Sequence, residues 1–184
     1  MPSSVGIYRC FTWSRVLINT LKGLKMRTET IEVYKFEELS DSAKEKAREW
    51  YRQDLDLFWS DESLDSIKAF CDHFGIHLKN WQVSPYSSPN YSVELANSNF
   101  RGLKLKDFQR DNMPTGYFLD CDLWITFYDQ FKATGCAKTA FDKALWAGFI
   151  GWRNDMESQL SDESIDDNLI INEYEFLESG KFHC

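Results

Sequence analysis

The sequence predicts an α+β fold: one domain in which a mainly antiparallel sheet is packed by about four helices. Strand-like and helix-like segments occur in clusters, not in the strict alternation of a parallel doubly wound sheet. Residues 26–184 suffice for one domain with a substantial core, and they contain no internal repeat and no low-complexity linker. An aromatic content of 16%, with seven tryptophans, argues against a disordered chain.

Residues 1–25 form a separate segment in this prediction. They contain four basic residues, no acidic residue, and no continuous apolar run as long as a signal peptide requires. Lys22 and Gly23 can be encoded by AAA-GGA, which resembles a bacterial ribosome-binding site just ahead of Met26. We therefore expect translation to begin at Met26 and residues 1–25 to be a leader, with a basic N-terminal arm as the alternative.

The first part of the domain predicts a strand followed by two helices. Residues 30–36 alternate β-branched or aromatic side chains with polar ones, which is typical of a strand. Ser40 is a suitable N-cap, and the residues after it place apolar side chains on one side at helical spacing, which predicts a helix over 41–52. A second helix follows WSDE (residues 59–62) and ends at Gly75.

Residues 79–128 predict β-structure with long loops. Two strands are expected at 81–86 and 91–96, joined by a turn at 87–90 and followed by a polar loop over 97–116. The clearest strand pattern is YFLDCDLWITFY (residues 117–128). Its apolar face would carry Leu119, Cys121, Leu123, Ile125 and Phe127, and its opposite face Phe118, Asp120, Asp122, Trp124, Thr126 and Tyr128.

The C-terminal region predicts two further helices and a short strand. Residues 137–160 have an apolar stripe at helical spacing, in which Gly148 and Gly151 would permit close approach of another backbone. Ser161 is the expected N-cap of a final helix over 162–171. The YEF segment (residues 174–176) is expected to form a short strand before a turn at ESGK.

We predict no metal or other cofactor. The five cysteines are odd in number, irregularly spaced and without a CxxC motif, which favours reduced thiols over a disulfide framework. Cys71, His73 and His77 could bind zinc, but a structural zinc site normally has four ligands, and Cys121 and Cys136 would have to complete it from distant positions. The alternative for His73 is a favourable place at a helix C-terminus.

Asp120 and Asp122 are the candidates for an enzymatic site. They would share one strand face, where paired carboxylates can hold a divalent cation or share a proton. No phosphate-binding glycine loop accompanies them, so a solvated strand face is the simpler interpretation. Trp124 and Tyr128 would lie on the same face and are predicted as apolar anchors for a partner if that face is open, or as core residues if a helix covers it.

The C-terminal region is strongly acidic. Residues 154–180 contain nine aspartates or glutamates and no lysine or arginine. Such a run is typical of a solvated helix face, but it also suits the docking of a basic partner. The residues predicted to supply this charge complementarity are Asp162, Glu163, Asp166 and Asp167.

Charge and hydropathy restrict the possible functions. Residues 26–184 carry 17 basic and 29 acidic residues, so their net charge is −12, against −8 for the whole chain. Non-specific binding to nucleic acid or to an anionic membrane needs a basic surface, so neither is expected. No segment approaches the roughly 20 apolar residues of a membrane span. We expect a cytoplasmic protein with a basic protein as its partner.

Several segments together resemble a known family: VYKFEELSDSAKEKAREWYRQ, TGYFLDCDLW, AFDKALWAGFIGWRNDMESQLSDESI and NEYEFLESGKF. These segments are similar to small, largely uncharacterised proteins of bacteriophages and prophages, some of which are labelled antitoxin of toxin–antitoxin stability system. The likeness runs from about Arg27 to Phe182, is weakest over 82–113, and includes a family start near Met26. The resemblance implies a phage accessory protein that is made in a bacterial cytoplasm and acts by binding host or phage factors. It supplies no catalytic residues.

The sequence therefore predicts a non-enzymatic phage or prophage protein that binds and neutralises a host or toxin protein, as an antitoxin does. Two alternatives remain open. One is a metal-dependent enzyme that uses Asp120 and Asp122, and the other is a structural protein of the phage.

Overall fold

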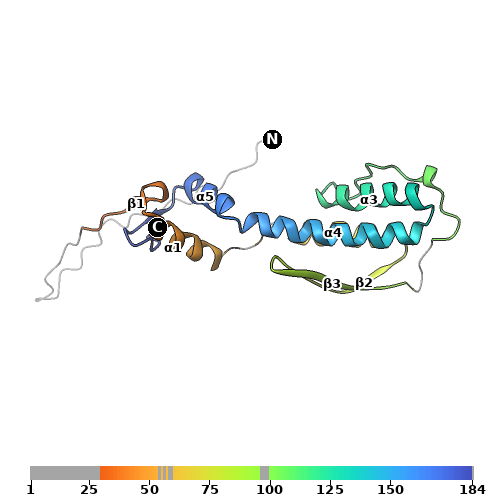
Figure 1. Cartoon of the computed structure of the whole chain (residues 1–184), viewed down its shortest axis with the longest axis horizontal. Helices are drawn as coiled ribbons and strands as arrows, with labels where there is room; N and C mark the ends of the chain where they lie inside the picture. Colours follow the sequence, from red (N-terminus) through yellow and green to blue (C-terminus); the bar gives the residue numbers. More distant parts are fainter. Residues whose placement is uncertain (1–29, 54, 56, 58–59, 96–99, 184) are drawn as a thin grey trace, which may run out of the picture. The chain divides into compact units, whose positions relative to one another are not determined.

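The computed structural model describes residues 30–183 except 54, 56, 58–59 and 96–99. The chain divides into a segment Met1–Ile31 and a compact unit Glu32–Cys184, which contains every described helix and strand. The start predicted at Met26 and the leader predicted over 1–25 lie outside the described residues. Five α-helices and two small antiparallel sheets form the described part, which confirms the α+β class (Figure 1).

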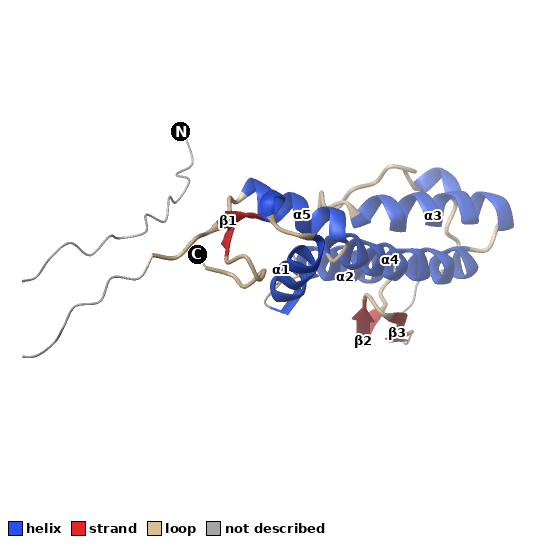
Figure 2. Ribbon diagram, turned by 60° about the vertical axis from the view of Figure 1, so that its left-hand side comes forward, coloured by secondary structure: helices blue, strands red, loops and turns tan. Residues whose placement is uncertain are grey.

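One hydrophobic cluster joins the two ends of the compact unit. Its elements are β1 (Tyr34–Lys35), the 3-10 helix η1 (Phe36–Glu38), α1 (Asp41–Gln53), α5 (Asp162–Ile171) and β4 (Glu175–Phe176). Strands β1 and β4 pair antiparallel, and the early and late elements lie side by side (Figure 2). We call this the terminal cluster; its buried residues are Phe36, Leu39, Ala43, Ala47, Ile165, Leu169 and Phe176.

The second hydrophobic cluster lies within the middle of the chain. Its elements are α2 (Ser60–His73), the strands β2 (His77–Ser84) and β3 (Ser87–Glu94), α3 (Leu119–Thr134) and α4 (Ala137–Gln159). We call this the helical cluster. Its core is rich in aromatic rings, and the largest fully buried ones are Phe70, Phe74, Trp124, Phe127, Phe141 and Phe149. None of the helices among the described residues has the length and apolar character needed to span a membrane.

Four of the helices agree closely with the prediction. Helices α1 and α5 begin after serine N-caps: Ala43 N donates to Ser40 Oγ at 3.4 Å, and Ser164 N donates to Ser161 Oγ at 3.3 Å. Helix α2 ends just before Gly75, which has a φ of +66°. Helix α4 matches the predicted range within a residue, so its apolar periodicity was sufficient to predict it.

The strand predicted over 117–128 is wrong, because α3 begins at Leu119 and includes the rest of this segment. Its alternating pattern matched a period of two, but the same residues also fit helical spacing. Leu119, Leu123, Phe127 and Phe131 recur every four residues and are all buried. The helix also continues to Thr134, which makes it 16 residues long and longer than a typical strand. Phe131, which continues the four-residue spacing, was therefore the sign of a helix that the prediction overlooked.

The hairpin was predicted in the right region but with the wrong turn. The chain reverses at Pro85 and Tyr86, and Tyr86 N donates to Ser84 Oγ at 3.2 Å. Residues 87–90, predicted as the turn, belong instead to β3. The polar loop continues after β3 as expected and contains a 3-10 helix η2 (Leu105–Asp107). The first strand, predicted over 30–36, is limited to Tyr34–Lys35.

Helices α3 and α4 approach closely because α4 has glycines at the contact. A Cβ atom on Gly148 would lie 2.5 Å from Leu123 Cδ2, and one on Gly151 would overlap the side chain of Asp122. The glycines were predicted to admit another backbone; what they admit is the side chains of Leu123 and Asp122 of α3. Larger residues would force the two helices apart.

Candidate functional site

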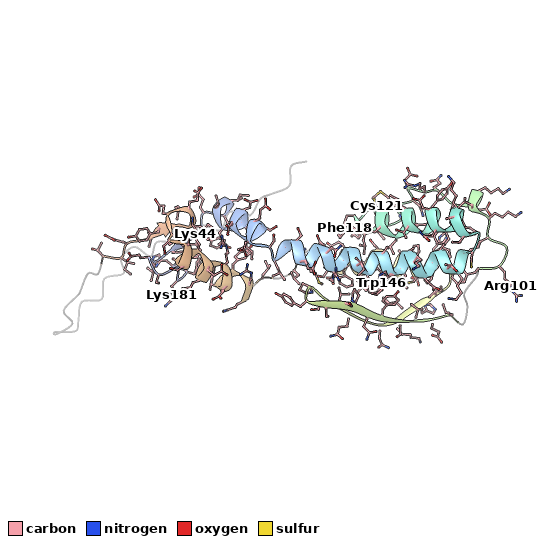
Figure 3. All side chains as sticks on the ribbon, viewed as in Figure 1. Lys44, Arg101, Phe118, Cys121, Trp146 and Lys181 are labelled. Carbon is pink, nitrogen blue, oxygen red and sulfur yellow. The ribbon has the colours of Figure 1, made fainter. Side chains whose placement is uncertain are left out.

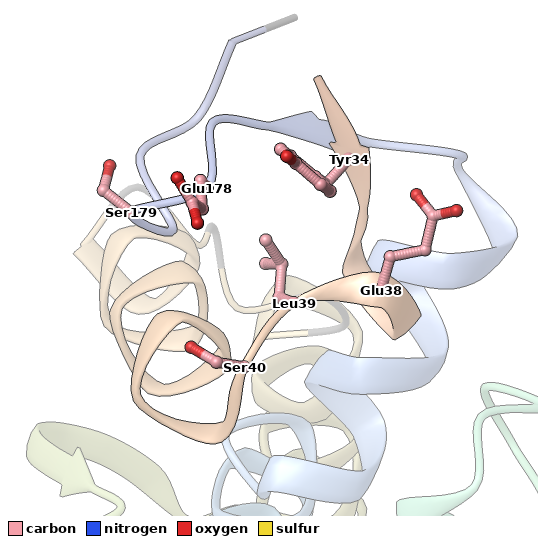
Figure 4. A pocket seen from close by; sticks show the side chains of 6 residues that line it. All are labelled: Tyr34, Glu38, Leu39, Ser40, Glu178 and Ser179. Atoms are coloured by element: carbon pink, nitrogen blue, oxygen red, sulfur yellow. The ribbon is translucent and has the colours of Figure 1, made fainter. Parts of the chain in front are cut away.

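A pocket of about 460 Å³ opens on the terminal cluster (Figure 4). Three segments line it: β1, the stretch from η1 to the start of α1, and the turn that follows β4. Leu39 points into the space between Tyr34 and Glu178 (Figure 4). The pocket thus combines carboxylates with an apolar wall, and its volume is typical of ligand pockets. Its lining residues are Tyr34, Glu38, Leu39, Ser40, Glu178 and Ser179.

Gly180 fixes the turn that carries Glu178. Leu177 N donates to Lys181 O, and Gly180 N donates to Leu177 O, both at 2.9 Å, which closes the turn. Gly180 has a φ of +83°, and a Cβ atom there would overlap the carbonyl oxygen of Ala43 in α1. Glycine tolerates both the left-handed backbone and this contact. The position of Glu178 beside α1 therefore depends on Gly180.

Glu38 reaches the pocket from η1. Lys35 N donates to Glu38 Oε2 at 2.8 Å, which holds this carboxylate near the start of the 3-10 helix. No described lysine or arginine forms an ion pair with Glu38 or Glu178. Both carboxylates therefore lack a cationic partner among the described residues.

Acidic side chains act on the hydroxyl of Tyr34, which lines the pocket. Tyr34 Oη donates to Glu32 Oε2 at 3.1 Å, and this hydrogen bond raises the pKa of the phenol above its ordinary value. The charges of Glu178 and Glu38 raise the pKa of Tyr34 further. The phenol is therefore neutral at physiological pH, and the field at its oxygen favours cations over anions.

Two of the predicted acidic residues are used within the fold. Asp166 accepts two hydrogen bonds from Arg48, each at 2.7 Å, and Asp162 forms an ion pair with Arg52. Both arginines lie on α1, so these carboxylates hold α5 against α1. The bond to Asp166 raises the pKa of the Arg48 guanidinium above its ordinary value.

Glu163 and Asp167 occupy the exposed side of α5 instead. Neither forms an ion pair with a lysine or arginine in the part of the chain that the structure describes. The predicted acidic surface is therefore divided: half of it stabilises the contact with α1, and half of it faces solvent.

The two predicted apolar anchors differ in accessibility. Trp124 is buried in the helical cluster, with its ring 5.2 Å from Phe70 and 4.9 Å from His73. The open face on which its anchor role depended does not exist, because helical geometry turns Trp124 inward. Tyr128 is half-buried on α3 and stays partly accessible.

Asp120 and Asp122 do not form the predicted carboxylate pair. Residues two apart in a helix point about 200° apart around the axis, whereas a strand would place them on one face. Asp120 is buried and accepts bonds from Thr115 N at 2.9 Å and Gly116 N at 3.0 Å, which tie the preceding loop to α3. Asp122 lies beside Gly151 of α4, and partial burial raises the pKa of its carboxyl. An enzyme site built on this pair is therefore not supported.

The candidate zinc ligands serve the helical cluster. Cys71 is fully buried, and burial raises the pKa of its thiol to about 12. Burial lowers the pKa of His73, whose ring packs against Trp124. Cys121 and Cys136 are exposed, and Cys121 lies on the outer side of α3 (Figure 3). Among the described residues, no three His, Cys, Asp or Glu side chains are grouped so that they could hold a metal ion.

Comparison of the chain with protein-family models, with curated proteins and with solved structures finds no match. The acidic pocket was not predicted from the sequence, because Tyr34 and Glu178 are far apart in the chain. Gly180 could have indicated one wall of the pocket, because a glycine in a tight turn after a short strand often marks a close contact between two backbone segments.

Proposed function

We propose that this chain is an accessory protein of the bacteriophage or prophage type, which binds and neutralises a basic host or toxin protein in a bacterial cytoplasm. The acidic pocket of the terminal cluster supports this proposal best. It offers two carboxylates that have no described cationic partner, next to an apolar wall formed by Leu39. Binding, and not catalysis, is the activity that such a surface serves.

A lysine or arginine side chain matches this pocket in both respects. Its aliphatic stem can cover Leu39 while its cationic head approaches one of the carboxylates that line the pocket. The exposed Glu163 and Asp167 on α5 add negative charge to the same cluster. Such a surface attracts a basic protein and raises its association rate, and it rejects acidic proteins.

The test is capture of a partner with the full-length tagged chain from bacterial lysate, washed first at low and then at high salt. A double variant, Glu38→Gln with Glu178→Gln, removes the two charges while the amide oxygens keep their accepting role. A control variant, Asp61→Asn with Asp65→Asn, removes two exposed charges from α2, where the described residues form no ion pair with either. The captured protein is then expressed alone and together with this chain.

We expect one basic protein that is retained by the wild type and the control, lost with the double variant and released by salt. Its effect on cell growth should be relieved by co-expression with this chain. A folded wild-type bait that retains no protein contradicts the proposal. A captured partner whose activity is unchanged by this chain contradicts neutralisation, and equal capture by the double variant contradicts the role of the pocket.

A further inference from the structure

Two large apolar side chains are exposed where α5 ends. Ile171 is 77% exposed and Ile170 is 40% exposed. Counted from Glu163, the residues Asp167, Ile170 and Ile171 stand at i+4, i+7 and i+8, so all four side chains share the outer side of the helix. Single exposed apolar residues are normal on a protein surface, whereas an apolar patch with a polar rim is typical of an interaction site.

A cleft of about 260 Å³ opens beside these isoleucines, where the end of α5 lies next to β1 (Figure 2). We call it the α5 cleft. Its volume is below the range of about 300–1,000 Å³ that is usual for small-molecule pockets, so it suits one inserted side chain better than a whole ligand. Its apolar lining residues are Phe36, Leu169, Ile170 and Tyr174, and its charged ones are Lys35, Glu37 and Glu173.

The charge around the α5 cleft is mainly negative. Lys35 is the one cation among the lining residues, and its charge is already paired within the fold. Its Nζ atom donates to Glu173 O at 3.0 Å and lies 3.4 Å from Glu175 Oε1. No described lysine or arginine forms an ion pair with the side chains of Glu37 or Glu173. The cleft therefore combines an apolar wall with carboxylates at its rim.

Glu173 occupies a backbone position that usually holds glycine. It is the one described residue other than glycine with a positive φ, at +55°. Glu173 N donates to Ile170 O at 3.0 Å, and Tyr174 N donates to Leu169 O at 3.1 Å, which is the Schellman motif that ends many helices. Glycine adopts this left-handed conformation without strain, whereas glutamate does not. Such strain is often found at binding sites, and here it places a carboxylate at the α5 cleft.

We propose that the α5 cleft is a docking site, separate from the acidic pocket, for a segment of the basic partner that carries an apolar side chain flanked by lysine or arginine. The apolar side chain enters the cleft against Ile170, and the flanking cations approach Asp167 and Glu173. This inference rests on the proposed function, because it takes the partner to be a basic protein. Charge selects this occupant, since the same rim repels a second copy of this chain, whose net charge is −8, and an anionic membrane.

The experiment is isothermal titration calorimetry of the full chain with a synthetic peptide that carries leucine and lysine at helical spacing. Two further peptides have serine in place of leucine or glutamate in place of lysine, which removes the apolar or the cationic part in turn. Ile170→Ser with Ile171→Ser removes the exposed apolar surface. Met113→Ser with Tyr117→Ser is the matched control, because these side chains precede α3 and are 46% and 38% exposed.

One more variant separates binding from stability. Glu173→Gly relieves the left-handed strain, so the midpoint of thermal unfolding should not fall. Binding of the leucine–lysine peptide should nevertheless weaken, because the rim loses a carboxylate. A purely structural role for Glu173 would leave peptide binding unchanged, which would contradict its place in the docking site.

We expect the leucine–lysine peptide to bind the wild type and the control within about threefold of each other, and the Ile170→Ser, Ile171→Ser variant to bind it about tenfold or more weakly. Equal binding of the serine–lysine peptide overturns the proposal, because charge alone would then suffice. Binding that Glu38→Gln with Glu178→Gln abolishes, and that the isoleucine variant keeps, assigns the peptide to the acidic pocket and also overturns it.

The α5 cleft and the proposed function fail in different ways. A chain that captures and neutralises a basic protein, but binds the peptide independently of the isoleucines, keeps the proposed function and loses the docking site. A chain that binds the peptide through the isoleucines, but relieves the effect of no captured protein, keeps the docking site for basic segments and contradicts neutralisation.

Discussion

The helical cluster and the terminal cluster are stabilised in different ways. The helical cluster is formed by consecutive segments, and its helices surround rings in direct contact, such as Phe70 and Phe141 stacked with centroids 5.3 Å apart. The terminal cluster joins residues more than a hundred positions apart, including the strand pair of Tyr34 with Phe176. Its core is smaller, and the ion pair between Arg48 and Asp166 adds to it at the edge.

The difference indicates which region opens first. Bringing distant segments together costs loop-closure entropy, and the small core of the terminal cluster offsets less of that cost. We expect the terminal cluster to open locally while the helical cluster stays folded. Binding surfaces are often found in the less stable parts of proteins, and the acidic pocket lies in the terminal cluster. Each of the following predictions tests this contrast.

The largest effect is expected from removing a buried ring in either cluster. Phe127 and Phe176 are both fully buried, so Phe127→Ala and Phe176→Ala should each cost about 3–5 kcal/mol locally. Hydrogen exchange read by mass spectrometry shows where the loss occurs. Phe176→Ala should speed exchange in α1 and α5 and leave α3 and α4 protected, because the two cores are separate. Equal acceleration in both clusters would show that they unfold as one unit.

A second prediction concerns the glycine that fixes the pocket. Gly180→Ala places a Cβ atom in a left-handed backbone and against the carbonyl oxygen of Ala43, so it should cost more than the 1–2 kcal/mol or so of conformational strain alone. Gly102→Ala is the control, since Gly102 has a φ of +76° but no atom within 4 Å of its Cβ position. Thermal unfolding compares the two. Equal losses of stability in the two variants would show that the contact between residue 180 and Ala43 adds nothing to the cost of the substitution.

A third prediction compares two arginine–aspartate pairs of the same geometry. Arg48 and Asp166 have side chains 18% and 27% exposed, whereas Arg110 and Asp129 are 54% and 46% exposed. Asp166→Asn should cost about 1–3 kcal/mol, because it removes the charge behind two short hydrogen bonds to a partly buried guanidinium, which keeps only the longer contacts to Glu45 and Asp162. Asp129→Asn should cost less than about 1 kcal/mol, as is usual for exposed pairs. Urea denaturation measures both, and similar costs would contradict a role for burial.

The sequence predicted those features that depend on local pattern. The N-caps at Ser40 and Ser161 and the stripe of α4 were identified because their signals lie within a few residues. The α3 segment was mistaken for a strand because its first half satisfies both periods, and the helical spacing becomes clear only when the pattern is followed to Phe131. The pairing of Arg48 with Asp166 and the pocket around Glu178 depend on contacts between distant segments, which one sequence does not encode locally.

Chemical labelling of cysteines perturbs the protein least, because it detects local opening of the helical cluster without changing a core residue. Cys136 is exposed, and hydrogen bonds from Thr139 lower the pKa of its thiol, so it should react readily with iodoacetamide at neutral pH. Cys71 is buried in the helical cluster with a thiol pKa of about 12, so it should react only when that cluster opens. Peptide mass spectrometry separates the two sites.

Labelling of Cys71 then tests the contrast directly. In the Phe176→Ala variant, Cys71 should stay as protected as in the wild type, because opening of the terminal cluster leaves its surroundings intact. In the Phe127→Ala variant, its labelling rate should rise with the population of the open state. Cys136 should react at the same rate in all three proteins, which controls for reagent and pH. Fast labelling of Cys71 in Phe176→Ala would mean that the terminal cluster is required to keep the aromatic core closed, and the binding surface would then share the stability of the whole compact unit.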